Sequence, residues 1–108
     1  MTSSATIIRS TESKKIEVVK IQRDGHLIAE DLVGKHTSPQ QVNQLFAHGD
    51  LHFIDGYLIK IYPEGQPPRI YSELEEAIKE ERTKNIYYWR SHVQNWYKLD
   101  GDSFKPLN

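Results

Sequence analysis

The 108-residue chain is long enough for one compact core and too short for two. A charged fraction of 27% with a formal net charge of −1 is typical of a globular protein and disfavours a polyanion binder. The absence of cysteine excludes disulfides, thiolate metal sites and thiol nucleophiles. No apolar run approaches the ~20 residues of a membrane span, and no leader pattern opens the chain. We therefore expect a cytoplasmic protein that does not associate with membranes.

The first 15 residues are rich in Ser, Thr, Lys and Glu, which predicts a mobile arm (1–15) ahead of a single α+β domain (16–108). Within this arm we expect at most a short edge strand at residues 6–9. The next segment, residues 16–33, contains β-branched runs on both sides of Asp24-Gly25 and predicts a first hairpin. Its register stays open, because loops of two and of three residues lead to different cross-strand pairs.

A helix is predicted over residues 39–48. Ser38 and Gln41 have the spacing of a capping box, and Pro39 occupies the favoured first helical position. Gly49 stands where a left-handed residue ends a helix. The helix is too short to persist alone, so its apolar stripe is expected to pack on a sheet.

A second hairpin is predicted around Asp55-Gly56. The returning run, residues 57–62, is almost entirely apolar, which is typical of a strand covered on both faces and predicts a central position in the sheet. The proline-rich residues 63–68 then predict an exposed loop.

A second helix is predicted from a capping box at Ser72 and Glu75. Two alternatives exist for its end. It could continue to Tyr97, or it could stop near Lys84 with Asn85 as a left-handed cap, followed by a strand of high β-propensity. We favour the stop, because the longer helix would place three polar side chains on its apolar face.

The complete pattern predicts an α+β fold in the order ββ-αββ-αββ, a mainly antiparallel sheet of Asp-Gly-linked hairpins with two helices packed on one face. Asp100-Gly101 would join the aromatic segment to a terminal strand near residues 103–105. A self-comparison at a shift of about 35 residues also suggests an αββ pseudo-repeat.

Aromatic residues concentrate between positions 87 and 97. Strand alternation would direct Tyr87 and Trp89 to one face of the sheet and Tyr88 and Arg90 to the other, so some aromatic surface should stay exposed. Trp, Tyr and Arg dominate binding hot spots. We therefore predict a partner-binding site that comprises Tyr87, Tyr88, Trp89, Arg90, Trp96 and Tyr97.

We expect no metal, no cofactor and no catalytic residue. His48, Asp50 and His52 lie close in sequence and His36 lies upstream, but a helix end followed by a strand would point these side chains in different directions. The carboxylates of the second helix follow the spacing of a solvated face. No nucleophile elbow or phosphate-binding loop is present.

These observations predict a small, non-enzymatic protein-binding or regulatory module, such as an inhibitor, adaptor or immunity-like protein, whose partner is another protein or a second copy of itself. Single-stranded nucleic-acid binding by the same aromatic segment is the alternative, which the lack of a positive stripe disfavours. A minor enzyme or small-ligand carrier is a third possibility and would require an enclosed pocket.

Overall fold

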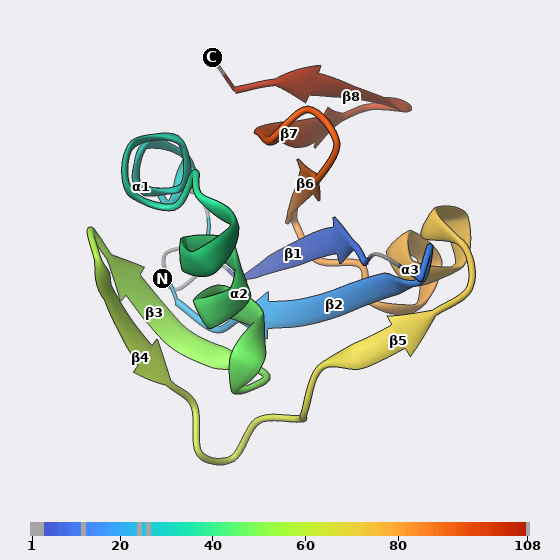
Figure 1. Ribbon diagram of the computed structural model, residues 1–108. Helices are drawn as coiled ribbons and strands as arrows, with labels where there is room; N and C mark the ends of the chain where they lie inside the picture. Colours follow the sequence, from blue (N-terminus) through green and yellow to red (C-terminus); the bar gives the residue numbers. More distant parts are fainter. Residues whose placement is uncertain (1–3, 12, 24, 26, 108) are drawn as a thin grey trace.

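The computed structural model describes residues 4–11, 13–23, 25 and 27–107. Together they form an α+β structure with one open, mixed sheet (Figure 1). In chain order the described elements are β1 (Ala5–Ser10), β2 (Ile16–Ile21), α1 (Ala29–Lys35), α2 (Pro39–Ala47), β3 (Leu51–Asp55), β4 (Leu58–Ile61), β5 (Arg69–Tyr71), α3 (Leu74–Glu80), β6 (Asn85–Arg90), β7 (Asn95–Asp100) and β8 (Ser103–Pro106).

The strands lie in the order β4-β3-β2-β1-β6-β7-β8, and β5 pairs with β2 beside the short β2·β3 contact. The pairs β1·β6 and β2·β3 are parallel, whereas the other pairs are antiparallel. The prediction of an α+β fold with a mainly antiparallel sheet is therefore confirmed. The predicted order ββ-αββ-αββ is not, because the described chain runs ββ-αα-βββ-α-βββ.

The strand β1 corrects the prediction of a mobile arm. It lies in the middle of the sheet, where Ile7 is paired with Val19 of β2 on one side and Tyr87 of β6 on the other. Ile7 and Ile8 are both fully buried, one on each face. The sequence does not predict this strand, because Ile7 and Ile8 have polar neighbours on both sides. The residues that cover the two faces of the strand are distant along the chain.

The helix α1 corrects the predicted first hairpin. The strand β2 forms as expected, but its antiparallel partners are β1 and β5, and residues 29–35 are helical. Ile28 and Leu32 are four residues apart and both buried, which is the spacing of one helical face. Part of the predicted turn, Asp24, lies outside the described residues.

The helix α2 is confirmed together with its start signals. The Ser38 side chain accepts a hydrogen bond from the Gln41 backbone N–H, and the Gln41 side chain accepts one from the Ser38 N–H. Gly49 has a φ of 83°. The strong agreement reflects signals that are entirely local to this segment.

The helix α3 begins and ends differently from the prediction. Its N-cap is Glu73, without a side-chain cap bond, rather than Ser72. It ends at Glu80, and Asn85 starts β6 instead of serving as a left-handed cap. The favoured stop before the aromatic segment is confirmed, because residues 85–90 and 95–100 form an antiparallel pair of strands.

The dipeptides Asp55-Gly56 and Asp100-Gly101 do not form the two central residues of their turns. Asp55 is the last paired residue of β3, opposite Leu58, so the loop is Gly56-Tyr57. Asp100 is likewise paired with Ser103. The strand β4 is also not central as predicted: it is the last strand of the described sheet, and most of its residues are exposed. The apolar composition of β4 therefore does not predict its position in the sheet.

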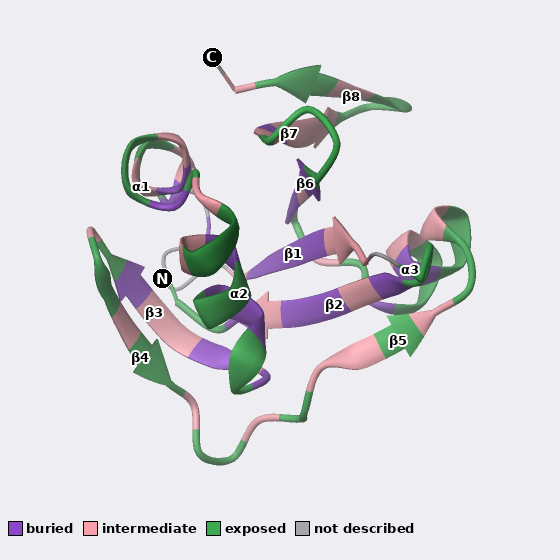
Figure 2. Ribbon diagram, viewed as in Figure 1, coloured by how far each residue is buried: buried purple, intermediate pink, exposed green. Residues whose placement is uncertain are grey.

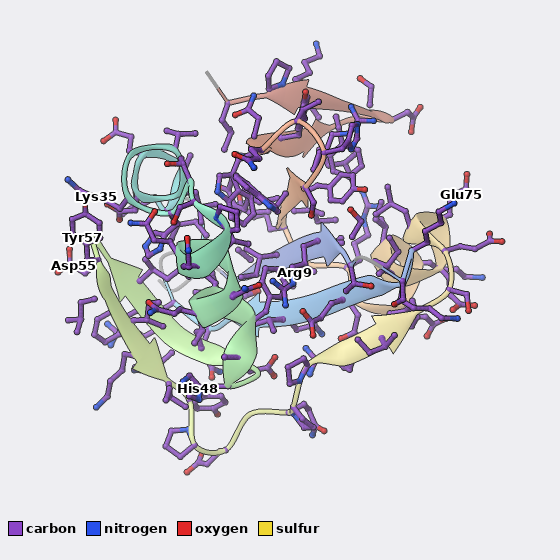
Figure 3. The ribbon with its side chains drawn as sticks, viewed as in Figure 1. Arg9, Lys35, His48, Asp55, Tyr57 and Glu75 are labelled. Atoms are coloured by element: carbon purple, nitrogen blue, oxygen red, sulfur yellow. The ribbon has the colours of Figure 1, made fainter. Side chains whose placement is uncertain are left out.

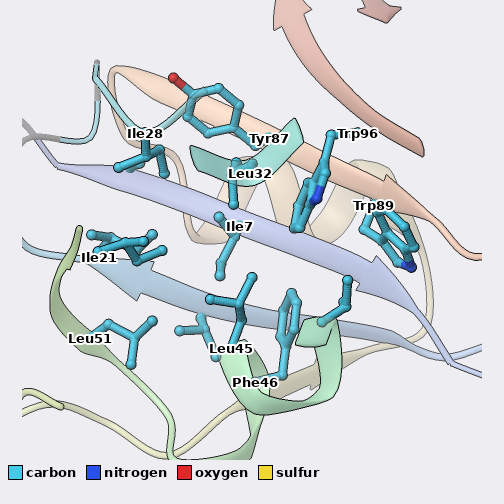
Figure 4. Packing of buried hydrophobic residues seen from close by; sticks show 14 residues of the cluster. Ile7, Ile21, Ile28, Leu32, Leu45, Phe46, Leu51, Tyr87, Trp89 and Trp96 are labelled. Atoms are coloured by element: carbon cyan, nitrogen blue, oxygen red, sulfur yellow. The ribbon is translucent and has the colours of Figure 1, made fainter. Parts of the chain in front are cut away.

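Two hydrophobic clusters form on opposite faces of the sheet. The larger one gathers α1 and α2 over β1, β2, β3, β6 and β7 (Figure 4). The smaller one places Ala77 of α3 against Ile8, Val18 and Ile86. The proposed αββ pseudo-repeat is consequently not a structural one, because α2 and α3 pack on opposite faces.

Candidate functional site

The six predicted site residues lie on the neighbouring strands β6 and β7. Trp89 is paired with Trp96, and Tyr88 is paired with Tyr97. Paired residues in an antiparallel ladder share a face. The pairing therefore divides the six residues into a group under the helices and a group on the opposite face.

Tyr87, Trp89 and Trp96 belong to the hydrophobic core under α1 and α2. The ring centroids of the two indoles are 5.3 Å apart. Trp96 Nε1 donates a hydrogen bond to the His36 carbonyl oxygen at 2.8 Å, and the Tyr87 hydroxyl donates one to the Gly25 carbonyl oxygen at 3.0 Å. Burial raises the pKa of the Tyr87 phenol. The expectation that these three side chains offer binding surface is corrected: they are core residues.

The opposite face of β6, β7 and β8 carries half-buried side chains, of which Tyr88, Leu99 and Phe104 pack against the smaller hydrophobic cluster and remain partly exposed. The Tyr88 and Phe104 ring centroids are 5.3 Å apart with an interplanar angle of 56°. The Arg90 guanidinium carbon lies 5.0 Å from the centre of the Tyr97 ring. We call this surface the aromatic face; it comprises Tyr88, Arg90, Tyr97, Leu99 and Phe104.

The aromatic face includes two residues that the prediction missed. Leu99 is paired with Phe104 across the β7–β8 turn. Alternation along the strand places Leu99 on the same face as Tyr97, and the predicted terminal strand would pair with it. Leu99 and Phe104 could therefore have been predicted from the sequence. The residues of β7 and β8 are intermediate or exposed apart from the buried Trp96, whereas most of β1 is buried (Figure 2).

Charge on the aromatic face is sparse. The Lys98 ammonium lies 5.5 Å from the centre of the Tyr87 ring, on the helix-covered side, and its pairing partner Lys105 projects to that side as well. Among the residues of β6, β7 and β8 that project on the aromatic face, Arg90 is the one with a formal charge. The face therefore offers stacking and apolar contact with one cation, rather than a track for phosphates.

The histidines considered as metal ligands do not converge. His48 is exposed at the end of α2 (Figure 3), and His52 stacks on Tyr62. The buried His36 donates a hydrogen bond from Nε2 to the Gly56 carbonyl oxygen, at a distance of 2.8 Å. Among the described residues, no three His, Asp or Glu side chains lie together in a way that could hold a metal ion.

Asp50 is part of an ionic network that sequence reasoning missed. Its Oδ1 lies 2.7 Å from the Arg69 Nη2, and its carboxylate accepts backbone hydrogen bonds from Lys20 and Gln66. Burial alone would raise the pKa of Asp50, but these hydrogen bonds outweigh burial and lower the pKa. The network connects β2 to β5 and is a structural rather than a ligand-binding arrangement, because its charges satisfy one another.

Glu81, the residue that follows the last turn of α3, is the second carboxylate of this network. Its Oε1 lies 2.6 Å from Arg69 Nε, and its Oε2 accepts a hydrogen bond from the Tyr71 hydroxyl at 2.8 Å. Burial and the bond to Glu81 raise the pKa of Tyr71 to about 12. No local motif signals this arrangement, since the three residues come from β5 and the end of α3.

An open groove of about 670 Å³ lies at the carboxyl ends of β1 and β6, against α2. Arg9 enters it, with its Nε 2.6 Å from Glu17 and its guanidinium over the Phe46 ring. The described residues that line the groove include no histidine or carboxylate. The groove can supply hydrogen bonds, but these residues do not supply a general acid–base pair.

No helix in the described part of the chain is both long and apolar enough to span a bilayer. In comparisons with known proteins, the chain matches no protein-family model, no curated protein and no solved structure.

Proposed function

We propose that this chain is a small, non-enzymatic binding or regulatory module that docks a partner protein on the aromatic face. The observation that carries the proposal is the half-buried group of Tyr88, Tyr97 and Phe104, with Arg90 stacked on Tyr97 at its margin. Such a group combines large contact area with polar tips, which is the composition of protein-binding hot spots.

Rigidity supports the proposal. Trp89 and Trp96 fix β6 and β7 from the opposite side, and Trp96 is further held by its bond to the His36 carbonyl. Aromatic side chains on a fixed sheet lose little conformational freedom when a partner arrives. The buried half of the predicted site then acts as support, and the partly exposed half makes the contact.

Chemistry on the face indicates the kind of partner. The stacked rings and Leu99 favour an apolar surface, and Arg90 can pair with a carboxylate at its margin. The partner we propose is therefore a protein with an apolar patch bordered by acidic residues. Binding would act by occlusion or by tethering, as for an inhibitor, an adaptor or an immunity-like protein.

Capture from the native host tests the proposal with four baits: the unaltered chain, Tyr97→Ser, Arg90→Glu and, as a control, Val93→Ser. Val93 is exposed in the β6–β7 loop, outside the aromatic face. We expect one protein to be retained by the unaltered chain and the control but lost with both face variants. Far-UV circular dichroism verifies that all four baits are folded. Equal retention by all baits contradicts the proposal.

Single-stranded DNA provides the second arm of this test. Fluorescence anisotropy with an oligo-dT probe measures binding at low and moderate salt. We expect no binding, because Arg90 alone cannot follow a phosphate backbone. Binding that weakens steeply with salt and disappears in Tyr97→Ser replaces the protein-binding proposal with the nucleic-acid one.

A further inference from the structure

The outer edge of β4 is an open sheet edge with apolar side chains. Its residue Leu58 is 58% exposed and Ile61 is 41% exposed, and the adjoining Tyr57 is 66% exposed. In the described sheet β4 pairs with β3 alone. An exposed apolar edge presents unpaired backbone groups to another strand, and proteins usually protect such edges.

The opposite edge of the same sheet is protected. The edge strand β8 ends with Lys105 and Pro106. A lysine and a proline are common devices against edge-to-edge pairing, since proline has no N–H to donate. The strand β4 has neither proline nor glycine, and Lys60 is its one charge. The contrast within one chain suggests that β4 is kept available for pairing.

The β3–β4 hairpin is also held in a fixed position. His36 Nε2 lies 2.8 Å from the Gly56 carbonyl oxygen in the loop, and the Lys35 ammonium lies 5.1 Å from the centre of the Tyr57 ring. Figure 3 shows Lys35, Asp55 and Tyr57 together at the tip of this hairpin. A preorganised edge loses less entropy when a second strand adds to it.

We infer that two copies of this chain associate by antiparallel pairing of β4 with β4, about a two-fold axis at Ile59. The pair next to a two-residue hairpin loop exchanges both backbone hydrogen bonds, and here that pair is Asp55 and Leu58. The peptide groups of Leu58 and Lys60 are therefore directed toward β3, and that of Ile59 is directed outward. Ile59 is thus available to pair with its own copy.

Charge selects this register. An axis at Lys60 would place Lys60 directly opposite Lys60 of the second copy, which is destabilising. An axis at Ile59 instead places Lys60 opposite Leu58 and the exposed Ile61 opposite the exposed Tyr57. Both copies then cover apolar side chains that are open in the single chain, as an isologous two-fold interface requires.

Asp55 makes the same register complementary in charge. Asp55 is exposed and lies opposite Leu58 on β3. With the axis at Ile59, Lys60 of the second copy lies on the far side of Leu58, two strand spacings or about 10 Å from Asp55 at the backbone. A lysine side chain can reach across Leu58 to that carboxylate, so each copy contributes one such pair.

Sedimentation equilibrium tests the pairing with a charge exchange. We expect the unaltered chain to be a dimer and both Lys60→Glu and Asp55→Lys to shift it to monomer. The double variant Asp55→Lys/Lys60→Glu should restore the dimer. Lys105→Glu on β8 and Arg90→Glu on the aromatic face are matched controls that should leave the dimer unchanged. Circular dichroism confirms that each variant is folded.

Cross-linking tests the register, because the chain contains no cysteine of its own. Paired residues on an antiparallel ladder have Cα atoms about 5.5 Å apart, which a disulfide can bridge. We expect Ile59→Cys to form a covalent dimer under mild oxidation at protein concentrations where Ser103→Cys does not. A monomeric unaltered chain, a dimer insensitive to the Lys60 and Asp55 variants, or a dimer lost in Arg90→Glu overturns the inference.

Discussion

The Trp96 indole N–H donates a hydrogen bond to the His36 carbonyl oxygen, 2.8 Å away, and connects strand β7 to the junction between α1 and α2. Both groups are buried. This bond holds β7 in position on the helix-covered side of the sheet. It thereby supports the proposed binding face on the other side of the same strand.

Replacing Trp96 should destabilise the protein in two steps. Trp96→Phe leaves the buried His36 carbonyl without its donor and should cost about 1–3 kcal/mol. Trp96→Ala also creates a cavity and should cost about 3–5 kcal/mol. Urea unfolding followed by circular dichroism measures both. Val93→Ala, in the exposed loop, is the control and should stay within about 0.5 kcal/mol. Similar values for Trp96→Phe and the control would contradict this role.

The two kinds of ion pair in this protein should differ strongly in their contribution to stability. Glu81→Ala removes one of the two carboxylates that pair with the largely buried Arg69, together with the acceptor of the Tyr71 hydroxyl, and should cost about 1.5–3 kcal/mol. Lys105→Ala breaks the solvent-exposed pair with Asp100 and should change the free energy of unfolding by less than about 1 kcal/mol. Thermal or urea unfolding of the two variants makes the comparison. Equal effects would mean that the network around Glu81 is not structural.

Asp50 should contribute to stability in a pH-dependent way. Its pKa in the folded state lies below the ordinary value of 3.8, so the unfolded chain binds its proton first as the pH falls. The stabilisation is therefore complete above that value and is lost as the pH drops through the lower folded pKa. The difference in free energy of unfolding between the unaltered chain and Asp50→Asn should shrink between about pH 5 and about pH 2. A constant difference over this range would contradict the prediction.

Two glycines should respond oppositely to alanine. Gly49 has a φ of 83°, and an added Cβ would collide with the Gln66 carbonyl oxygen, so Gly49→Ala should destabilise by more than about 1 kcal/mol. Gly34 lies in α1 with open space around it, so Gly34→Ala should stabilise by up to about 1 kcal/mol. Melting temperatures of both variants test the sign. A stabilised Gly49→Ala would show that the loop shifts freely.

Local signals account for the parts of the fold that the sequence predicts well. Ser38, Gln41 and Gly49 define α2 because caps act over a few residues. The high β-propensity of the aromatic segment likewise identifies β6. What fails is the assignment of neighbours. The central position of Ile7 in the sheet depends on pairing with a strand about 80 residues later, which no local pattern can predict.

The candidate site shows the same division. Alternation separates Tyr87 and Trp89 from Tyr88 and Arg90, and the structure has this separation. The sequence does not indicate which group is covered, because its pattern predicts a strand over residues 26–33, whereas residues 29–35 form α1. Tyr87, Trp89 and Trp96 lie in the core under α1 and α2, and Tyr88 and Arg90 lie on the other face.

The parallel pair β1·β6 has a consequence for how the chain acquires its structure. The strand at the start of the sequence receives its second neighbour from residues 85–90, so the central ladder cannot close until those residues leave the ribosome. Until then β1, which contains Ile7 and Ile8, can pair with β2 but not with β6. We expect the nascent chain to form at most an unstable β1–β2 hairpin. Long-range closure of this kind makes folding slow relative to helical proteins of the same size. The strand β1 therefore becomes part of a stable sheet only after residues 85–90 have been synthesised.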